Sequence, residues 1–243
     1  MQKTDDLNKL FVKWRDHQKS MGPEYANRYF IPDGIIDEET FETESCRVLF
    51  ISNEANTKYE SHESCTADRR KDFLEFSQSG HDNWRGKMRI RMCELYKVIA
   101  QKPEMPANDA ALHFAMMNVN KSGGGSSTDI NALREYCRHF AEELLEEIRI
   151  IDPDIIIWCG HRTFCLASEY LGAEGEQGGK YFLPIASKKV PLIPAWHTSY
   201  FQGRIPPAAG YKDRTLGKQV IKLVRELEKH NWNGIKASDF EAT

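Results

Sequence analysis

Three short apolar runs, each leading into a polar loop and then a helical pattern, constrain the fold of this chain most strongly. They cover residues 46–52, 112–118 and 155–159, and a fourth apolar run follows at 190–195. Strands that alternate with helices pair in parallel and are buried on both faces, which explains why these runs are continuously apolar. We therefore predict an α/β fold, with a three-layer αβα arrangement and a central, mostly parallel four-stranded sheet.

The helical patterns between these runs favour the same architecture. Apolar residues recur at helical spacing along residues 130–148, and Asp129 with the two residues before it offers side-chain oxygens to cap this helix. Residues 121–127 are rich in Gly and Ser and are predicted to form a flexible loop, and residues 172–180 a second loop. Further helices are predicted over residues 6–19, 88–100, 162–171 and 213–229.

The composition narrows the class of protein. The 243 residues carry a net charge of −3 and include no apolar run of the ~18 residues that a membrane-spanning helix needs. The six cysteines show neither a CxxC pair nor metal-ligand spacing, so we expect reduced thiols and no metal or other cofactor. The first residues lack the apolar core of a signal peptide, and we expect a cytoplasmic monomer without membrane contact.

The carboxyl ends of the predicted strands carry polar residues. Glu54 and Asn56 follow the first run, Asn118 and Asn120 the second, and His197 the last. In sheets of this kind the ligand binds beyond the carboxyl ends of the strands, so we expect these residues to meet at one site.

One carboxylate, one amide and one imidazole suit cleavage of the bond between a sugar and a nucleobase. The carboxylate can stabilise the cationic sugar or orient water, and the imidazole can donate a hydrogen bond to the departing base. An Asn side chain presents both a donor and an acceptor, and it can read the hydrogen-bonding edge of a flipped pyrimidine.

Four stretches, in order along the chain, resemble motifs of the uracil-DNA glycosylase superfamily, most closely its bacterial and archaeal family four. Residues 47–55 read Arg-Val-Leu-Phe-Ile-Ser-Asn-Glu-Ala, which is similar to a strand followed by Gly-Glu-Ala-Pro-Gly. Residues 114–121 read Phe-Ala-Met-Met-Asn-Val-Asn-Lys, which is similar to a strand ending in Asn-Ala-Val-Lys. Residues 135–160 match the following helix, proline and strand, and residues 189–204 resemble the closing motif His-Pro-Ser-Tyr-Leu-Leu-Arg.

The resemblance covers roughly residues 46–230 and implies a DNA glycosylase fold in a single domain, residues 1–243. Residues 1–45 would then be an N-terminal helical extension, and residues 57–83 an insertion.

The resemblance also implies roles for individual residues, with damaged or modified DNA as the partner. It implies catalytic groups at Glu54, His197 and Asn56. It implies base-binding groups at Asn118, Trp84, Asn53 and Ala55, with Trp84 stacked on the flipped base. It implies DNA contacts at Ser199, Tyr200, Phe201, Arg204, Lys121 and Arg85.

The chain departs from the family at positions that border the expected pocket. Asn56-Thr57 replaces the family's Pro-Gly, and Thr198 replaces the proline of the closing motif. Of the family's iron–sulfur ligands only Cys137 has a counterpart, so we expect no cluster. The resemblance implies uracil or another non-standard base as the target, and the changed rim with the insertion beside it favours a bulky 5-modified pyrimidine, such as the hydroxymethyl- or glucosyl-cytosine of phage DNA. The expected role is in DNA repair or phage defence.

Two alternative functions remain open at the level of sequence. One is a non-catalytic nucleic-acid-binding member of the same fold. The other is a hydrolase of free nucleosides or nucleotides, which would need no basic surface near Trp84 and Arg204.

Overall fold

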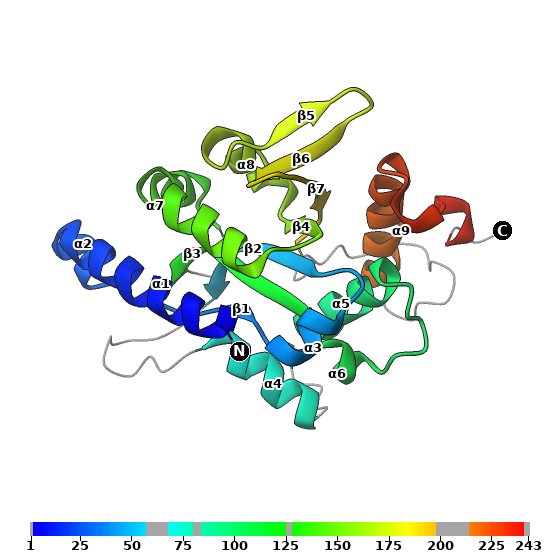
Figure 1. Cartoon of the computed structure of the whole chain (residues 1–243), viewed down its shortest axis with the longest axis horizontal. Helices are drawn as coiled ribbons and strands as arrows, with labels where there is room; N and C mark the ends of the chain where they lie inside the picture. The colour runs from blue at the N-terminus through cyan, green and yellow to red at the C-terminus, as the bar shows by residue number, and fades with distance from the viewer. Residues whose placement is uncertain (1, 57–67, 80–83, 125–127, 198–213, 241–243) are drawn as a thin grey trace.

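A mixed sheet of seven strands runs through the centre of the fold, in the order β1-β3-β2-β4-β7-β6-β5 (Figure 1). The computed structural model describes residues 2–56, 68–79, 84–124, 128–197 and 214–240. The strands are β1 (Gly34–Ile35), β2 (Val48–Asn56), β3 (Phe114–Gly124), β4 (Ile155–Cys159), β5 (Glu174–Glu176), β6 (Lys180–Ile185) and β7 (Lys188–Ala195).

The four central strands β3, β2, β4 and β7 are parallel to their neighbours, which confirms the predicted α/β class. The prediction of four strands was wrong, because antiparallel strands extend both edges. On one side the two-residue β1 pairs with β3, and on the other the hairpin of β5 and β6 follows β7. The strand β5 falls within the stretch 172–180 that was predicted to be a loop.

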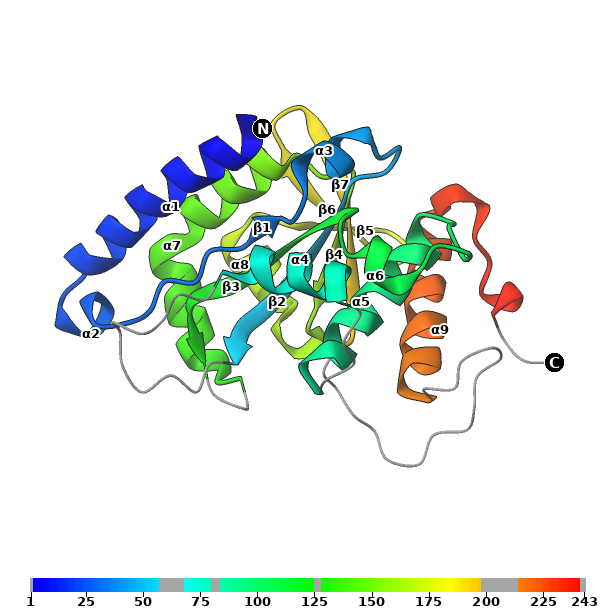
Figure 2. The same cartoon turned by 90° about the horizontal axis from the view of Figure 1, so that it is seen from below.

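Helices cover both faces of the sheet and give three layers (Figure 2). One face is covered by α1 (Gln2–Ser20), α7 (Ile130–Ile151) and α8 (Cys165–Tyr170), and is called the α1/α7 face here. The other face, the α5/α9 face, is covered by α4 (Arg69–Ser79), α5 (Trp84–Ile99), α6 (Ala107–Ala110) and α9 (Arg214–Lys229). Shorter elements are α2 (Pro23–Ala26), α3 (Glu38–Thr43) and the 3₁₀ turns η2 (His161–Thr163), η3 (Trp232–Gly234) and η4 (Ala237–Asp239).

The alternation along β2 shows how the two hydrophobic cores are built. Val48 and Phe50 pack in the core on the α5/α9 face, whereas Leu49 and Ile51 pack in the core on the α1/α7 face. Both faces are buried, so the strand is continuously apolar up to Ile51. Side chains along a strand alternate between faces, and Asn53 follows Leu49 and Ile51 to the α1/α7 face, where it contacts Thr128 before α7.

The start of α7 follows the predicted capping rule. The Asp129 carboxylate accepts hydrogen bonds from the backbone N–H groups of Asn131 and Ala132. These donors have no partner inside the helix, so the cap stabilises its first turn by about 1 kcal/mol.

Residues 1–45 are not an appendage to the sheet. The side chains of Leu7 and Trp14 on α1 are fully buried against α7, and β1 joins the sheet. The part of the predicted insertion that the structure describes is also integral, because Phe73 and Phe76 of α4 enter the core on the α5/α9 face. Among the described residues, no helix combines the length and the apolar character needed to cross a membrane.

Candidate functional site

The carboxyl ends of the parallel strands bring the predicted site residues to one edge of the sheet. In the register of β2, Ser52 lies opposite Asn118 of β3 and Cys159 of β4. Cys159 lies opposite Ala195 of β7, two residues before His197. Three strand spacings of about 4.8 Å separate β3 from β7, so Asn118 and Ala195 are about 14 Å apart across the sheet.

Strand alternation assigns Asn118 and the end of β7 to the same face. Phe114 and Met116 pack on the α5/α9 face, so Asn118 follows them to that face. Ala195, which leads into His197, also packs in this core. Glu54 lies opposite Asn120 in the register of β2 and β3, and its carboxyl lies near Thr128 at the start of α7.

Glu54 is partly buried beside an amide from the neighbouring strand. The Asn120 side chain donates from Nδ2 to Glu54 Oε2 at 3.4 Å. Burial raises the pKa of the Glu54 carboxyl above its ordinary value, although hydrogen bonds from Asn120 and Thr128 act in the opposite direction. A carboxylate with a raised pKa is a better proton acceptor near neutral pH than an exposed one.

His197 is held by its backbone against α9. Gln219 donates from Nε2 to the His197 carbonyl oxygen at 3.1 Å. Burial lowers the pKa of the His197 imidazole, so the ring is neutral at neutral pH and keeps one N–H donor. The preceding Trp196 ring lies against the ammonium groups of Lys218 and Lys222, at 5.1 and 4.9 Å from its centroid.

Asn118 has a partner that the sequence did not indicate. The carboxylate oxygen Oδ2 of Asp33 accepts from the Asn118 backbone N–H at 2.7 Å and from its side-chain Nδ2 at 3.2 Å. Asp33 is fully buried just before β1, and 85 residues separate it from Asn118. In the sequence, Asp33 stands out only as a charged residue next to the short apolar segment 34–36.

Asn53 has a structural role that differs from the predicted contact with a base. Its Oδ1 accepts from the Thr163 hydroxyl at 2.6 Å, and its Nδ2 donates to Thr128 Oγ1 at 3.2 Å. A Cβ on Gly160 would lie 2.7 Å from the same Oδ1, so only glycine allows this close approach. The Asn53 side chain thus ties the turn after β4 to the start of α7.

The predicted contact between Lys121 and a DNA phosphate is wrong. Its side chain is fully buried on the α1/α7 face, where the ammonium pairs with Asp33 and Glu147. The stretch 121–127 was expected to be a loop, but β3 extends to Gly124 and carries Lys121 under α1. The ammonium cannot reach solvent from this position.

The remaining predicted contacts fall where side chains are not described. Ala55 and Asn56 are the last residues of β2, and Trp84 and Arg85 begin α5, but only their backbone is placed. Four predicted DNA contacts lie outside the described residues altogether: Ser199, Tyr200, Phe201 and Arg204.

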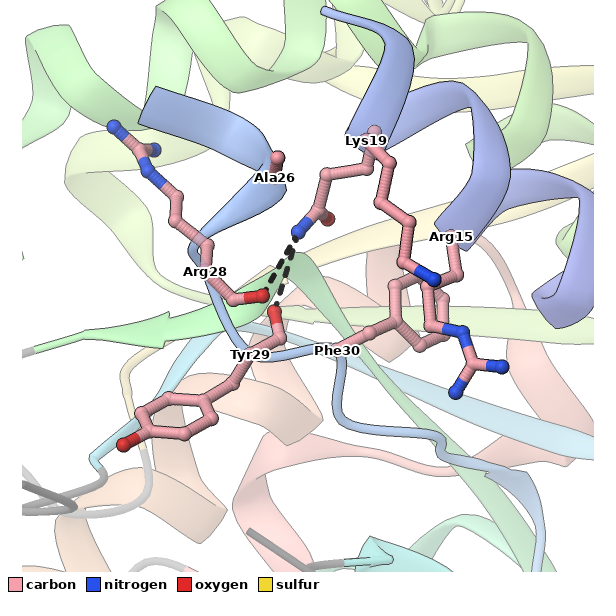
Figure 3. A pocket seen from close by; sticks show the side chains of 7 residues that line it. Arg15, Lys19, Ala26, Arg28, Tyr29 and Phe30 are labelled. Atoms are coloured by element: carbon pink, nitrogen blue, oxygen red, sulfur yellow. Dashed lines mark hydrogen bonds between the residues drawn. The ribbon is translucent and has the colours of Figure 1, made fainter. Parts of the chain in front are cut away.

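A basic pocket of about 200 Å³ lies beside the end of β3, between α1 and the segment after α2 (Figure 3). Arg15 and Lys19 of α1 line it together with Tyr29 and Phe30. Gln18 joins the pocket to β3, because its Oε1 accepts from the Ser122 hydroxyl at 3.3 Å. Arg28 also lines the pocket, but Figure 3 shows its guanidinium directed away from Arg15 and Lys19.

The carboxyl ends of the strands therefore carry three groups: the Glu54 carboxyl with its raised pKa, the neutral His197 imidazole, and the Asn118 amide bonded to Asp33. Within the described ranges, no three His, Cys, Asp or Glu side chains lie close enough together to hold a metal ion.

No protein-family model matches this chain, and no curated protein matches it.

Proposed function

We propose that this protein is a DNA glycosylase that hydrolyses the bond between deoxyribose and a flipped, non-standard base and leaves an abasic site. One observation carries the proposal: the parallel strands bring Glu54, Asn118 and the segment before His197 to the same edge of the sheet. The resemblance of four ordered sequence motifs to the uracil-DNA glycosylase superfamily supports it independently.

The proposed reaction breaks the bond between C1′ of the sugar and the ring nitrogen of the base. The bonding pair leaves with the base as an anion, and the sugar becomes an oxocarbenium ion. Water then attacks C1′ and transfers a proton to the Glu54 carboxylate. The neutral His197 imidazole donates a hydrogen bond to a base oxygen, where the negative charge of the leaving base develops. Asn118 reads the hydrogen-bonding edge of the base.

We expect uracil or a bulky 5-modified pyrimidine to be released. Incubation with oligonucleotides that each hold one candidate base, followed by alkali, converts an abasic site into a strand break. Uracil, hypoxanthine, 5-hydroxymethylcytosine and glucosylated cytosine form the panel, and His197→Ala is the control that should lose the product. Fast release from uracil alone would exclude the modified-base preference.

The same assay separates the two alternatives. A non-catalytic binding protein would retain the oligonucleotide without strand breaks, and its binding would be insensitive to Glu54→Gln. A nucleoside hydrolase would release base from free deoxynucleosides faster than from DNA. Either result would contradict the proposed function.

DNA contacts are proposed for Arg15 and Lys19, which are exposed at the basic pocket beside the end of β3. Each phosphate contact contributes about 0.9 to the slope of log affinity against log salt concentration. The double variant Arg15→Ala/Lys19→Ala should therefore reduce this slope by about 2 without changing which base is released.

The matched control for this variant is Lys13→Ala, on an exposed residue of α1 that does not line the pocket. Affinities measured by fluorescence anisotropy between 50 and 200 mM salt give the slopes. Equal slopes for the wild type and the double variant would exclude a DNA contact at the pocket.

A further inference from the structure

A cluster of three charged side chains is completely buried between the sheet and α1. Asp33, Lys121 and Glu147 each have an exposed fraction of 0%. The Lys121 ammonium contacts Asp33 Oδ1, and it lies 3.0 Å from Glu147 Oε1 and 2.7 Å from Oε2. The rings of Phe11 and Trp14 lie 5.7 and 5.4 Å from the same ammonium.

Such a cluster is a poor way to stabilise a fold. Removing charged groups from water costs several kcal/mol per ion, and well-packed apolar side chains of similar volume usually stabilise a protein at least as well. A buried ionic cluster is therefore expected where it fixes the orientation of a functional side chain. The contacts of Asp33 identify such a group in this protein.

Asp33 joins the buried cluster to the candidate base-reading amide. Its Oδ1 faces Lys121, and its Oδ2 accepts from both the backbone N–H and the side-chain Nδ2 of Asn118. Burial raises the pKa of the Glu147 carboxyl well above its ordinary value. Asp33 faces three donors, namely the Lys121 ammonium and the backbone and side-chain N–H groups of Asn118, so its carboxylate oxygens act as acceptors.

An acceptor at this position allows one orientation of the Asn118 amide. Its NH₂ group must face Asp33, so Oδ1 and the second N–H remain for a ligand. A rotated amide would bring Oδ1 against Asp33 Oδ2, leaving two acceptors in contact without a proton between them. That arrangement costs the hydrogen bond and adds repulsion inside a buried site.

We propose that Asp33 is a specificity-determining positioning residue, which fixes the Asn118 amide and so makes the protein discriminate between 4-oxo and 4-amino pyrimidines. The inference rests on the proposed function. A 4-oxo pyrimidine presents an acceptor at O4 beside a donor at N3, and a 4-amino pyrimidine presents the reverse order. A freely rotating amide can match either edge, whereas a fixed amide matches only one.

The test compares Asp33→Asn with Glu147→Gln. In Asp33→Asn the oxygen of the new amide remains with Lys121, and its NH₂ turns toward Asn118. There it favours the rotated Asn118 amide and leaves the Asn118 backbone N–H without its acceptor. Glu147→Gln alters the same Lys121 contact and borders Asp33 but does not touch Asn118, which makes it the matched control. Asp33→Ala is the second variant, because it leaves Lys121 paired with Glu147 and frees the Asn118 amide.

Specificity is measured as the ratio of kcat/KM for uracil and cytosine, and for the 5-hydroxymethyl forms of each, in the same oligonucleotide. The wild-type preference between the two bases, in whichever direction it lies, should shrink at least ~10-fold in both Asp33 variants and stay at the wild-type value in Glu147→Gln. An unchanged ratio in Asp33→Ala, with only a lower rate, would overturn the inference. If the wild type releases no base from any oligonucleotide, the proposed function itself fails.

A second readout is independent of activity. In protein labelled with ¹⁵N-asparagine, the two side-chain amide protons of Asn118 should exchange slowly with solvent, because one of them is bonded to buried Asp33. Both Asp33 variants should accelerate this exchange at least ~10-fold, and Glu147→Gln should leave it slow. Equal exchange in all four proteins would exclude the fixed amide, whatever bases are released.

Discussion

Lys121→Met is expected to lower the free energy of unfolding by about 3–5 kcal/mol, because it leaves two buried carboxyl groups without their cation. Asp33 and Glu147 both contact this ammonium, and both are shielded completely from water. Urea unfolding followed by circular dichroism measures the loss. The matched control is Lys9→Met, which removes an exposed lysine paired with Asp6 and should leave the urea midpoint unchanged. An equal, small loss in both variants would contradict the role assigned to Lys121.

The pH dependence of the free energy of unfolding provides a second test of the same cluster, because its direction can be predicted. The pKa of Glu147 is raised in the folded protein, so the folded state binds a proton that the unfolded state releases above its ordinary pKa of 4.5. Stability from this group is therefore largest at low pH and falls as pH rises toward the raised value. Lys121→Met removes the cation that favours the ionised form, so its deficit should be larger at pH 8 than at pH 5. A deficit that grows on acidification would contradict this assignment.

The parts of the fold that were predictable are those with long or continuous apolar patterns. The runs that became β2, β3 and β4 are apolar because both faces of the sheet are covered, and α7 carries an apolar stripe along its whole length. Of the edge strands, β6 was predictable, because the apolar residues of 181–186 indicate a short strand. The two-residue β1 and the three-residue, Gly-containing β5 are too short to show a period.

Local sequence was also misleading at Lys121. It precedes Ser122 and three glycines, a composition typical of a loop, yet it continues β3 and lies under α1. Its partners Asp33 and Glu147 stand 88 and 26 residues away along the chain. Contacts over such separations depend on the packing of α1 and α7 against the sheet, and no pattern around Lys121 encodes them. The hydrogen bonds between Asp33 and Asn118 could not be predicted from the sequence for the same reason.

The polar ends of the parallel strands were predictable because one rule governs them. Ligands bind beyond the carboxyl ends of parallel strands, and the register brings Asn118 and Glu54 to that edge together with the end of β7. What the rule cannot supply is the orientation of each side chain. Asn53 and Glu54 are adjacent in sequence, but Asn53 turns to Thr128 and Thr163, while Glu54 contacts Asn120.

Glu54→Gln should reduce the rate of base release by about 10²–10⁴-fold, because an amide cannot accept the proton of the attacking water. In the wild type the rate should increase with pH through the raised pKa of Glu54, since only the ionised carboxylate acts as the base. The His197 imidazole is neutral above its lowered pKa, so it adds no falling limb at neutral pH. The residual rate of Glu54→Gln should not depend on pH over the range where the wild-type rate rises. Single-turnover kinetics on an oligonucleotide with one target base measure both effects.

The matched control for this variant is Glu142→Gln, an exposed glutamate on α7 far along the chain from the strand ends, which should keep the wild-type rate and pH profile. His197→Ala provides the complementary signature. Loss of one hydrogen-bond donor to a developing anion typically costs ~10²–10³-fold in kcat, and it should leave the rise with pH in place because Glu54 is intact. A pH rise that persists in Glu54→Gln and disappears in His197→Ala would reverse the two assignments. If Glu54 is the base and His197 the donor, the pH dependence of the rate is lost in Glu54→Gln and kept in His197→Ala. If both residues have only a structural role, the two variants should show the same pH dependence.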